Sequence, residues 1–546
     1  MMPASSTTAT VVEYHDPSQA IELELVEAPL APPKTNILHG RFSVDKGRLE
    51  NSPEHLTNAG LPLLSKWRAS IIIGTVSGVS LINCMLIGIL IVSLPTMGRE
   101  LGLPDALLLW PASVSSLTCG CTLLLSGLVS DVIGGRKIYL IGTFLLILTT
   151  IACGVCQTGL QLILFRAAQG LALSLCLPSS VILITSNFPT GSYRNVAFAC
   201  LGAGQPVGFS IGLVLGGIFV QNFGWRWGYY IGAMLTFVIF IISIFGIPVD
   251  QEIQTQSFRT IFGRLGSEID WIGCALISTS LGLFSYVLSV LAGSTSSFIA
   301  PAPITLSAIA VLLVPVFMWH TRRQERSGRK VIIPPSLWSN TIFTSLCIAV
   351  FLIWGTFNAI QYFLAVFYQL VQTLSAIQTS IRFLPMVVTS IVANVLTGWL
   401  VKHVRADALV LSSAIITAIS PLLMAIINPG WSYWVCALVA TACAPICADV
   451  LFTVANLVIT TIFPPQTHGL AGGVFNTIAN IGNSVGLAVT AVVASTVTMA
   501  GKGDPIEILM DGYRATFWLC FSGNIMALFV VGLGLRKIGK VGIKMD

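Results

Sequence analysis

The residue best suited to chemistry in this chain is Asp449, an acid predicted to lie deep inside an apolar segment. A charge in hydrocarbon is costly, so a carboxyl group there is a candidate for taking up and releasing a proton. Thr453 and Asn456 follow at helical spacing and share its face. Pro445, on the same face, lacks an N–H and frees a backbone carbonyl one turn earlier.

Two arginines, Arg166 and Arg382, also fall within apolar segments. Arg166 lies in the outer half of its predicted helix, where insertion scales give a cost of about 3 kcal/mol, and this makes it a candidate functional group. A structural salt bridge from Asp449 to either arginine is the alternative to a proton-carrying role. For Arg166 alone, a side chain that snorkels to the interface is a further alternative.

Amide and aromatic side chains at helical spacing favour a site for an organic ligand of mixed polarity. Trp354, Asn358, Gln361 and Tyr362 form one such face. Hydrogen bonding between helices is the alternative role for them. Asn83, in the middle of the first apolar segment, either binds substrate or bonds to a neighbouring backbone.

A polar loop joins the second and third apolar segments and contains Gly127, Asp131, Gly134 and Arg136. We expect Gly127 to let two helices approach closely. Asp131 and Arg136 can bridge helix ends and hold one face of the molecule shut. An ordinary solvated turn is the alternative.

The elements that must position these groups are membrane helices, because 55% of the residues are hydrophobic and only 9% are charged. A spanning helix needs about 20 mostly apolar residues. Fourteen such windows are predicted, which makes the protein all-α. They start near residues 71, 106, 138, 161, 195, 227, 271, 301, 341, 376, 406, 431, 470 and 514.

Glycines recur every fourth residue in the fifth segment, at Gly208, Gly212 and Gly216. Residues four apart lie on nearly the same helix face, so these three form a flat groove that favours close helix packing.

Lysine and arginine are distributed unevenly over the loops. With the N-terminus inside, the tails and inner loops hold 22 of the 28 basic residues, and the outer loops hold four. This asymmetry predicts that both termini are cytoplasmic. The basic residues behind the net charge of +6 are therefore best explained by the orientation of the chain in the membrane. We expect no nucleic-acid partner.

The sequence contains no motif for a metal site, a disulfide framework or a nucleotide-binding loop. The thirteen cysteines lack zinc or disulfide spacing, and Cys153 and Cys156 are predicted to be packing residues. No Gly-x-x-x-x-Gly-Lys-Ser/Thr loop is present, which excludes a nucleotide site of that type. We expect no cofactor.

The chain divides into five predicted parts. Residues 1–68 form a disordered cytoplasmic tail, 69–249 a six-helix bundle, and 250–340 a linker with two extra helices. Residues 341–537 form a second six-helix bundle, and 538–546 a short tail.

Several short motifs resemble those of one transporter family. They are the Gly127 loop, Arg166-x-x-Gln169-Gly170, the glycine groove, Gly224-Trp225-Arg226 and Asp270-Trp271-Ile-Gly273. Together with fourteen helices, they resemble the drug:proton antiporter-2 family of the major facilitator superfamily, particularly its fungal aminotriazole-resistance-like branch. The resemblance implies two bundles around a cavity lined by the first, fourth, ninth and twelfth helices. It also implies that Arg166 influences proton coupling.

The sequence departs from the family pattern at three places. The glycine groove resembles the antiporter motif of this superfamily, Gly-x-x-x-Gly-Pro-x-x-Gly, but Leu213 stands where that motif has proline. Leu86 and Gly88 occupy the aspartate and threonine positions of the first helix. Lys402 replaces aspartate where a second copy of the Gly127 loop should fall. The missing first-helix acid raises the interest of Asp449.

We therefore expect a monomeric, proton-driven exporter of small organic compounds in the cell membrane, with the vacuolar membrane as an alternative location. A nutrient importer and a non-transporting membrane sensor are the alternative functions. Asp449 and Arg166 would couple protons, and the Gly127 loop would be a cytoplasmic gate. The predicted cavity residues are Asn83, Gln169, Trp354, Asn358, Gln361, Tyr362, Thr453 and Asn456.

Overall fold

The computed structural model describes residues 66–104, 107–188, 192–248, 270–293, 301–327, 335–401, 403–463, 468–501 and 503–536. These residues form helices joined by short connections, with no strand among them. The predicted disordered tail lies outside the described residues, except that its last three residues belong to the first helix. The short C-terminal tail, 538–546, lies outside them as well.

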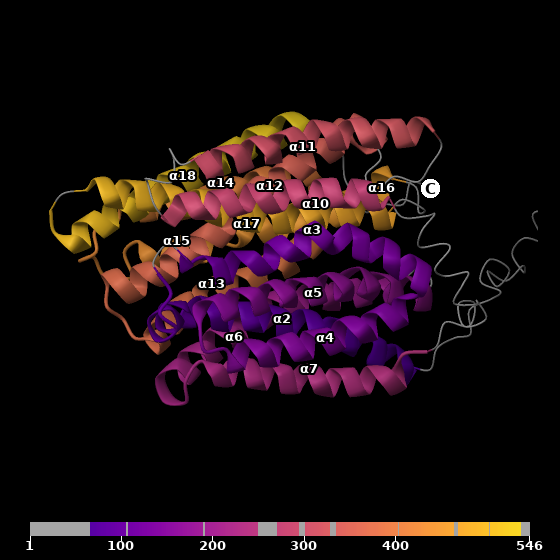
Figure 1. The fold of residues 1–546 in the computed structure, drawn as a ribbon, viewed down its shortest axis with the longest axis horizontal. Helices are drawn as coiled ribbons and strands as arrows, with labels where there is room; N and C mark the ends of the chain where they lie inside the picture. The colour runs from indigo at the N-terminus through magenta and orange to yellow at the C-terminus, as the bar shows by residue number, and fades with distance from the viewer. Residues whose placement is uncertain are drawn as a thin grey trace, which may run out of the picture. The chain divides into compact units, whose positions relative to one another are not determined.

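The helices run roughly parallel in one layered bundle (Figure 1). The first six are α2 (Lys66–Glu100), α3 (Trp110–Ile133), α4 (Gly135–Val155), α5 (Gly159–Asn187), α6 (Ser192–Asn222) and α7 (Arg226–Gly246). Two extra helices follow, α10 (Trp271–Gly293) and α11 (Pro301–Arg326). The second set is α12 (Thr341–Val366), α13 (Ala376–Leu400), α14 (Ala406–Ile426), α15 (Ala437–Cys443), α16 (Ile446–Ile462), α17 (His468–Ala500) and α18 (Pro505–Gly534). A short helix, η4 (Pro335–Ser339), precedes α12, and a π-helical turn, η5 (Phe367–Val371), follows it.

The expected number of membrane helices is confirmed within the described part of the chain. Thirteen helices there are long and apolar enough to span a membrane, when α15 and α16 count as one. α10, whose apolar stretch is shorter, is the fourteenth. The largest error in a predicted start concerns α18, which begins at Pro505 and not near residue 514. Its first turns carry charges that lower hydropathy, but a proline in the first turn favours a helix start there.

Local sequence explains where several helices begin. Asn340 caps α12 by accepting hydrogen bonds from the N–H groups of Ile342 and Phe343. Ser375 and Gln378 form a reciprocal capping box at the start of α13. These caps satisfy N–H groups that have no partner within their own helix.

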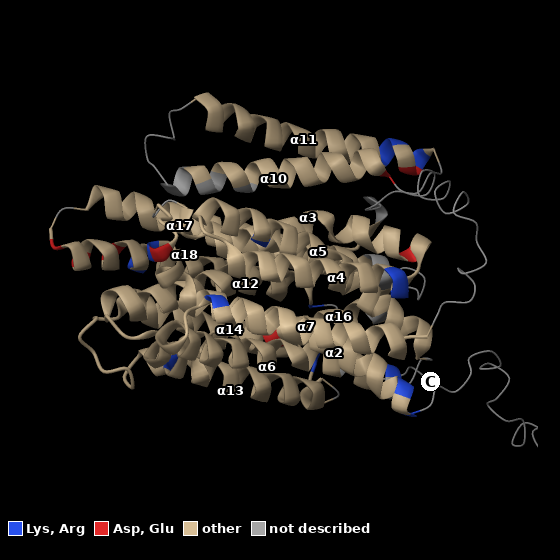
Figure 2. Cartoon of the chain, turned by 60° about the horizontal axis from the view of Figure 1, so that its bottom comes forward, with Lys and Arg blue, Asp and Glu red and all other residues tan. Residues whose placement is uncertain are grey.

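Basic side chains distinguish the two ends of the bundle. In Figure 2 the blue positions at the start of α2 and the end of α11 lie at the same end of the molecule. Arg136 and Lys137, at the start of α4, belong to this end too. We call it the inner end, because the charge distribution predicts that it faces the cytoplasm. The opposite end is the outer end.

Close packing of glycine against a neighbouring backbone occurs in both halves. A Cβ added to Gly212 of α6 would lie 2.0 Å from the carbonyl oxygen of Met85 in α2, and Gly208 is equally tight against Leu81. In the second half, a Cβ on Gly486 of α17 would lie 2.3 Å from the Cα of Gly355 in α12. The predicted glycine groove is therefore a packing surface, and the second bundle repeats it.

A second repeated feature lies at the outer end. Arg226, at the start of α7, donates to the carbonyl oxygen of Cys156, the C-cap of α4, at 3.2 Å. Arg514, in α18, donates to the carbonyl oxygen of Ile427, the C-cap of α14, also at 3.2 Å. Each arginine satisfies a terminal carbonyl and interacts favourably with the dipole of the helix that it caps. The repeat that is barely visible in sequence is thus present in the contacts.

Among the described residues, the largest buried apolar cluster shared by the two bundles lies toward the outer end. One buried cluster contains Leu86 and Leu94 of α2 together with Phe363 and Phe383 of the second bundle. Toward the inner end, the described residues form separate clusters, one around Tyr139 in the first bundle and another in the second. The outer halves therefore share one buried cluster. The inner halves have distinct buried clusters, although the half-buried Leu124 of α3 packs against the one in the second bundle.

The two extra helices lie against one side of both bundles. α10 packs on α3 and on α17, and the Ser278 hydroxyl donates to the carbonyl oxygen of Cys121 in α3 at 2.7 Å. Figure 2 shows α11 outermost, with α10 between it and the rest of the molecule. α10 therefore spans the boundary between the two bundles.

The glycine contacts predict opposite effects for two alanine substitutions in α6. Gly212→Ala should lower the free energy of unfolding by about 1–3 kcal/mol, because a methyl group there meets backbone that cannot rotate away. Gly202→Ala, where nothing lies within 4 Å, should be neutral or slightly stabilising, since alanine favours helix over glycine. Thermal unfolding of the purified variants measures both. Equal effects at the two sites would contradict the packing role of Gly212.

Candidate functional site

Asp449 lies at a break in the twelfth membrane helix. α15 ends at Cys443, and α16 begins at Ile446 with Pro445 as its N-cap residue. The break follows from Pro445, which cannot donate the backward hydrogen bond that continues a helix. Asp449 consequently falls in the first turn of α16, where the N-terminal end of the helix dipole favours a negative charge.

Thr417 of α14 bridges this break. Its hydroxyl donates to the carbonyl oxygen of Cys443 at 3.1 Å and accepts from the N–H of Cys447 at 2.9 Å. Backbone groups that a proline releases inside a membrane need such partners, because hydrocarbon supplies none. One side chain therefore satisfies both sides of the gap and fixes the turn that carries Asp449.

The carboxylate of Asp449 is held by neutral partners from α13. The Ser390 hydroxyl donates to it at 2.5 Å, and Asn394 is a second hydrogen-bonding side chain. Asn394 also donates to the Ser390 carbonyl oxygen at 3.0 Å. The ion pairs found within the described residues lie elsewhere, so the alternative of a salt bridge to Arg166 or Arg382 is wrong.

The two polar residues that share a face with Asp449 bond within their own helix. The Thr453 hydroxyl donates to the carbonyl oxygen of Asp449 at 3.1 Å. Asn456 is exposed and donates to the Phe452 carbonyl oxygen at 2.9 Å. Neither joins the Ser390 group, and their assignment to a substrate cavity stays a prediction.

Arg166 is buried in a polar cluster of the first bundle. Its Nε donates to the carbonyl oxygen of Pro111 in α3 at 2.9 Å, and its Nη1 donates to Oε1 of Gln169 at 2.6 Å. Gln169 in turn donates to the Thr150 hydroxyl of α4 at 2.9 Å. The side chain is only 2% exposed, so the snorkelling alternative is wrong. Arg166 links α3, α4 and α5, and none of its contacts reaches Asp449.

The four residues of the predicted ligand face of α12 differ in burial and in their partners. Trp354 is half-buried and forms ring contacts with Phe452 and Phe475, at 6.2 and 6.4 Å between centroids. Asn358 donates to the carbonyl oxygen of Asn483 in α17 at 3.2 Å. These contacts are of the interhelical kind that the alternative proposed, although both side chains are only partly buried.

The other predicted cavity residues are placed as follows. Gln361 and Tyr362 are each 6% exposed, and the Tyr362 ring packs on Phe363 at 5.2 Å. Asn83 of α2 is half-buried. Their role in substrate binding stays a prediction.

The polar loop between α3 and α4 meets some expectations and fails one. Gly134 has φ 107°, a conformation that favours glycine. Arg136 donates to the carbonyl oxygen of Ile244, near the end of α7, at 2.7 Å, and so bridges two helix ends. The expected close approach at Gly127 is wrong: the nearest atom to an added Cβ is Pro178 Cβ at 3.7 Å, an ordinary contact. Asp131 is exposed at the end of α3.

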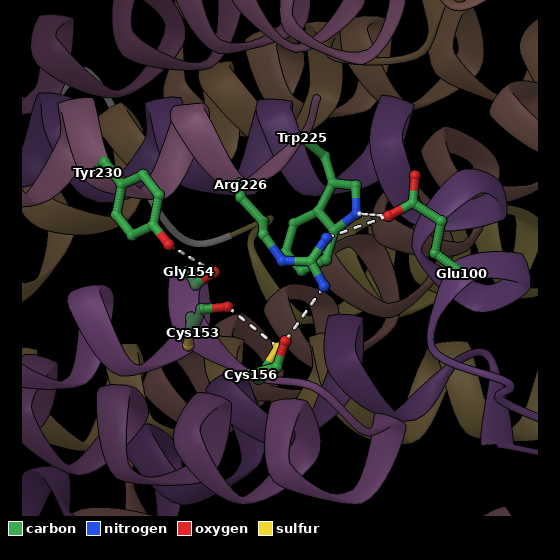
Figure 3. Close-up of polar contacts among 7 residues, drawn as sticks. All are labelled: Glu100, Cys153, Gly154, Cys156, Trp225, Arg226 and Tyr230. Carbon is green, nitrogen blue, oxygen red and sulfur yellow. Dashed lines mark hydrogen bonds and ion pairs between the residues drawn. The ribbon is translucent and has the colours of Figure 1, made fainter. Parts of the chain in front are cut away.

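A polar cluster at the outer end was not foreseen from sequence (Figure 3). Arg226 lies over the Trp225 ring at 4.4 Å and pairs with Glu100 at 3.1 Å. Trp225 Nε1 donates to the same carboxylate oxygen at 2.8 Å. Burial raises the pKa of the nearby Cys156 thiol above its ordinary value, so this cysteine stays uncharged. The motif around Trp225 was noted, but its partner Glu100 is 125 residues away.

A second buried acid, Asp270, was quoted from the sequence only as part of a motif, and its burial and its partner were not predicted. Asp270, just before α10, has a side chain that is 2% exposed, and its Oδ1 lies 2.9 Å from Nε2 of His320 in α11. The same oxygen accepts from the N–H of Gly273 at 2.9 Å, which is an N-cap contact. The Asp270-Trp271-Ile-Gly273 motif signalled this cap, but nothing in the sequence pointed to His320.

This combination of fourteen apolar helices, two repeated six-helix bundles and isolated polar groups in the interior is typical of a membrane transporter. The chain belongs to the Major Facilitator Superfamily, whose family model matches residues 76–263 and 271–487. The protein is therefore a multi-pass membrane transporter of that superfamily.

Individual relatives agree with the expected branch. The chain is 42% identical over 525 residues to MFS-type transporter 1 of Pyricularia oryzae, covering 88% of this chain and 85% of that protein. It is 28% identical to efflux pump terG of Aspergillus terreus, covering 82% and 83%. It is 23% identical to the aminotriazole resistance protein of Saccharomyces cerevisiae, covering 78% and 76%. The resemblance to efflux and resistance proteins of this superfamily is confirmed.

The bridging role of Thr417 predicts a loss of stability in Thr417→Val. This variant keeps the shape of the side chain but leaves the Cys447 N–H and the Cys443 carbonyl without a partner. The free energy of unfolding should fall by about 1–3 kcal/mol. Thr417→Ser, which keeps the hydroxyl, is the matched control and should lose much less. Denaturant unfolding of the purified proteins tests this, and equal stability of the valine and serine variants would refute the bridge.

Proposed function

We propose that this transporter exports a small organic compound in exchange for protons, with Asp449 as the proton carrier. The observation that carries the proposal is an acid at a helix break inside the membrane, held by hydroxyl and amide groups and by no cation within the described residues. An intramembrane carboxyl of this kind is by default a functional group.

Both protonation states of Asp449 find support in this environment. The Ser390 hydroxyl, the Asn394 amide and the N-terminal end of α16 favour the carboxylate. Burial between α13 and α16 favours the neutral acid, because hydrocarbon solvates charge poorly. Opposed influences of this sort are what a group needs if it is to bind and release a proton during each cycle.

The packing of the two bundles supports alternating access. The outer halves share one buried apolar cluster, whereas the buried residues of the inner halves form two clusters that meet through the half-buried Leu124 of α3. Two hydrogen bonds also join the bundles at the outer end: Gln369 Nε2 donates to the Val92 carbonyl oxygen at 3.0 Å, and the Ser380 hydroxyl donates to that of Leu213 at 2.6 Å. This arrangement corresponds to a state closed at the outer end. Export requires that these contacts separate while the inner ends come together.

Arg166 and the polar loop have distinct parts in this proposal. Arg166 lies in a cluster separate from Asp449, so it acts on the proton site through its long-range field and by fixing α3, α4 and α5 relative to one another. Arg136 anchors the inner end of α4 to α7 within the first bundle. Together with Asp131, it forms the inner gate when the bundles close there.

The cargo and direction rest on chemistry and on the relatives. Trp354, Asn358 and Asn83 are half-buried and offer aromatic and amide groups to a ligand of mixed polarity. Relatives that are named as an efflux pump and a resistance protein favour export of toxic compounds. The charge distribution favours cytoplasmic termini, and the cell membrane is the proposed site of action.

Asp449→Asn tests the proton-carrying role, because it keeps the shape of the side chain and removes the titrating group. A toxicity-protection screen in cells that lack their own pumps first identifies a substrate. Transport of that substrate into inside-out vesicles with an imposed pH gradient should then fall at least tenfold in the variant. Exchange of labelled for unlabelled substrate without a gradient should persist.

Asp511→Asn is the control for loss of an acid, since Asp511 is exposed and pairs with Arg514 at the outer end. It should transport like the wild-type protein. Gradient-driven transport that survives unchanged in Asp449→Asn would exclude Asp449 as the carrier. Gradient-driven accumulation in cells in place of protection would identify an importer.

A further inference from the structure

Arg382 is an intramembrane cation that the proposed cycle does not use. It lies six residues after the start of α13, about 9 Å into the helix at 1.5 Å per residue, and it is half-buried. None of the ion pairs in the described part of the chain includes it. A charge at this depth is costly unless it has a function or a partner.

Two tyrosine rings and one amide surround the guanidinium. Its carbon lies 5.4 Å from the Tyr368 ring centroid and 5.1 Å from that of Tyr433. Its Nη1 donates to Oε1 of Gln372. Tyr433 donates its hydroxyl to the Arg382 carbonyl oxygen at 2.8 Å, which fixes that ring in place. Burial raises the pKa of Tyr433 to about 12, so this tyrosine stays neutral and leaves the charge of Arg382 uncompensated.

Arg226 shows what a fully paired arginine at the outer end looks like in the same protein (Figure 3). It too lies over an aromatic ring, but it also pairs with the carboxylate of Glu100 and donates to a backbone carbonyl. Arg382 has the aromatic contacts and one neutral acceptor. A guanidinium has five N–H donors, and a carboxylate is the acceptor that matches its planar shape best.

The backbone beside Arg382 is unusual in a way that independently favours a ligand site. Tyr368 belongs to the π-helical turn η5, and Gln372 is the C-cap residue of that turn. The next residue, Thr373, has φ 52°, which is uncommon for a residue with a side chain. π-Turns and strained residues concentrate at functional sites.

From these observations we propose that Arg382, Tyr368 and Tyr433 form an anion-binding site that takes an organic carboxylate with an aromatic body. The carboxylate would accept from the guanidinium, and the aromatic part would pack on the tyrosine rings. The proposal deepens the export function, on which its biological meaning rests, by assigning organic anions as the substrate class. Gln369, adjacent to Tyr368 in the same turn, donates to the Val92 carbonyl oxygen across the bundle boundary, so the site adjoins the contacts that join the two bundles at the outer end.

Binding of radiolabelled benzoate to the purified full-length protein in lipid nanodiscs tests the proposal without any gradient. The wild-type protein should bind benzoate saturably, and excess unlabelled benzamide, its neutral analogue, should compete poorly. Arg382→Gln should weaken binding at least tenfold. Arg382→Lys keeps the charge but not the planar guanidinium. Its affinity for benzoate should lie between those of the wild-type protein and Arg382→Gln. Arg99→Gln removes an exposed arginine at the same end and should bind like the wild-type protein.

Failure to bind benzoate in the wild-type protein, or equal binding by Arg382→Gln, would overturn the proposal. Size-exclusion chromatography checks that each variant is folded. If Arg382→Gln is not folded, Tyr433→Leu, which removes one stacking ring, should weaken benzoate binding. Tyr433→Phe, which keeps the ring and loses only the hydrogen bond that positions it, should weaken binding less. Benzoate binding is measured without a gradient and gradient-driven transport is measured separately, so an error in the proton-carrier assignment and an error in the anion site give different results.

Discussion

The poor solvation of charge and of backbone polar groups in hydrocarbon is the constraint on which this structure depends. Three ionisable side chains, Arg166, Asp449 and Arg382, lie within the helical interior, and each is held by neutral groups from another helix or loop. The break at Pro445 presents the same problem for the backbone, and Thr417 of α14 solves it. Polar groups inside this bundle therefore determine which helices stay together.

Those contacts group the helices into units. Arg166 and Gln169 join α3, α4 and α5, while Asp449 and Thr417 join α13, α14 and α16. The glycine contacts then hold α6 on α2 and α17 on α12. Each bundle is thus cross-linked internally, whereas few polar contacts cross between the bundles. This is the mechanical requirement for two bodies that move relative to each other.

Sequence predicted well whatever depends on local composition. Helix number followed from hydropathy, and Pro445 predicted that a backbone carbonyl is freed before Asp449, because both are properties of neighbouring residues. Partners distant in sequence were not accessible. Ser390 is 59 residues from Asp449, and Glu100 is 126 from Arg226. The close approach expected at Gly127 was wrong, since a glycine in a motif does not reveal what lies opposite it. The influence of Arg166 on proton coupling, which the family resemblance implies, stays a prediction.

The position of α10 has a mechanical consequence. Because this helix is attached to α3 through Ser278 and also packs on α17, it resists separation of the two bundles along that side. The opposite side, where α6 meets α13, has no such cover among the described helices. Any rotation of one bundle against the other should therefore have its axis near α10, and the widest displacement should occur at α6 and α13. The two extra helices, α10 and α11, would therefore make the motion of the bundles asymmetric, with small displacements on their side and larger ones on the opposite side.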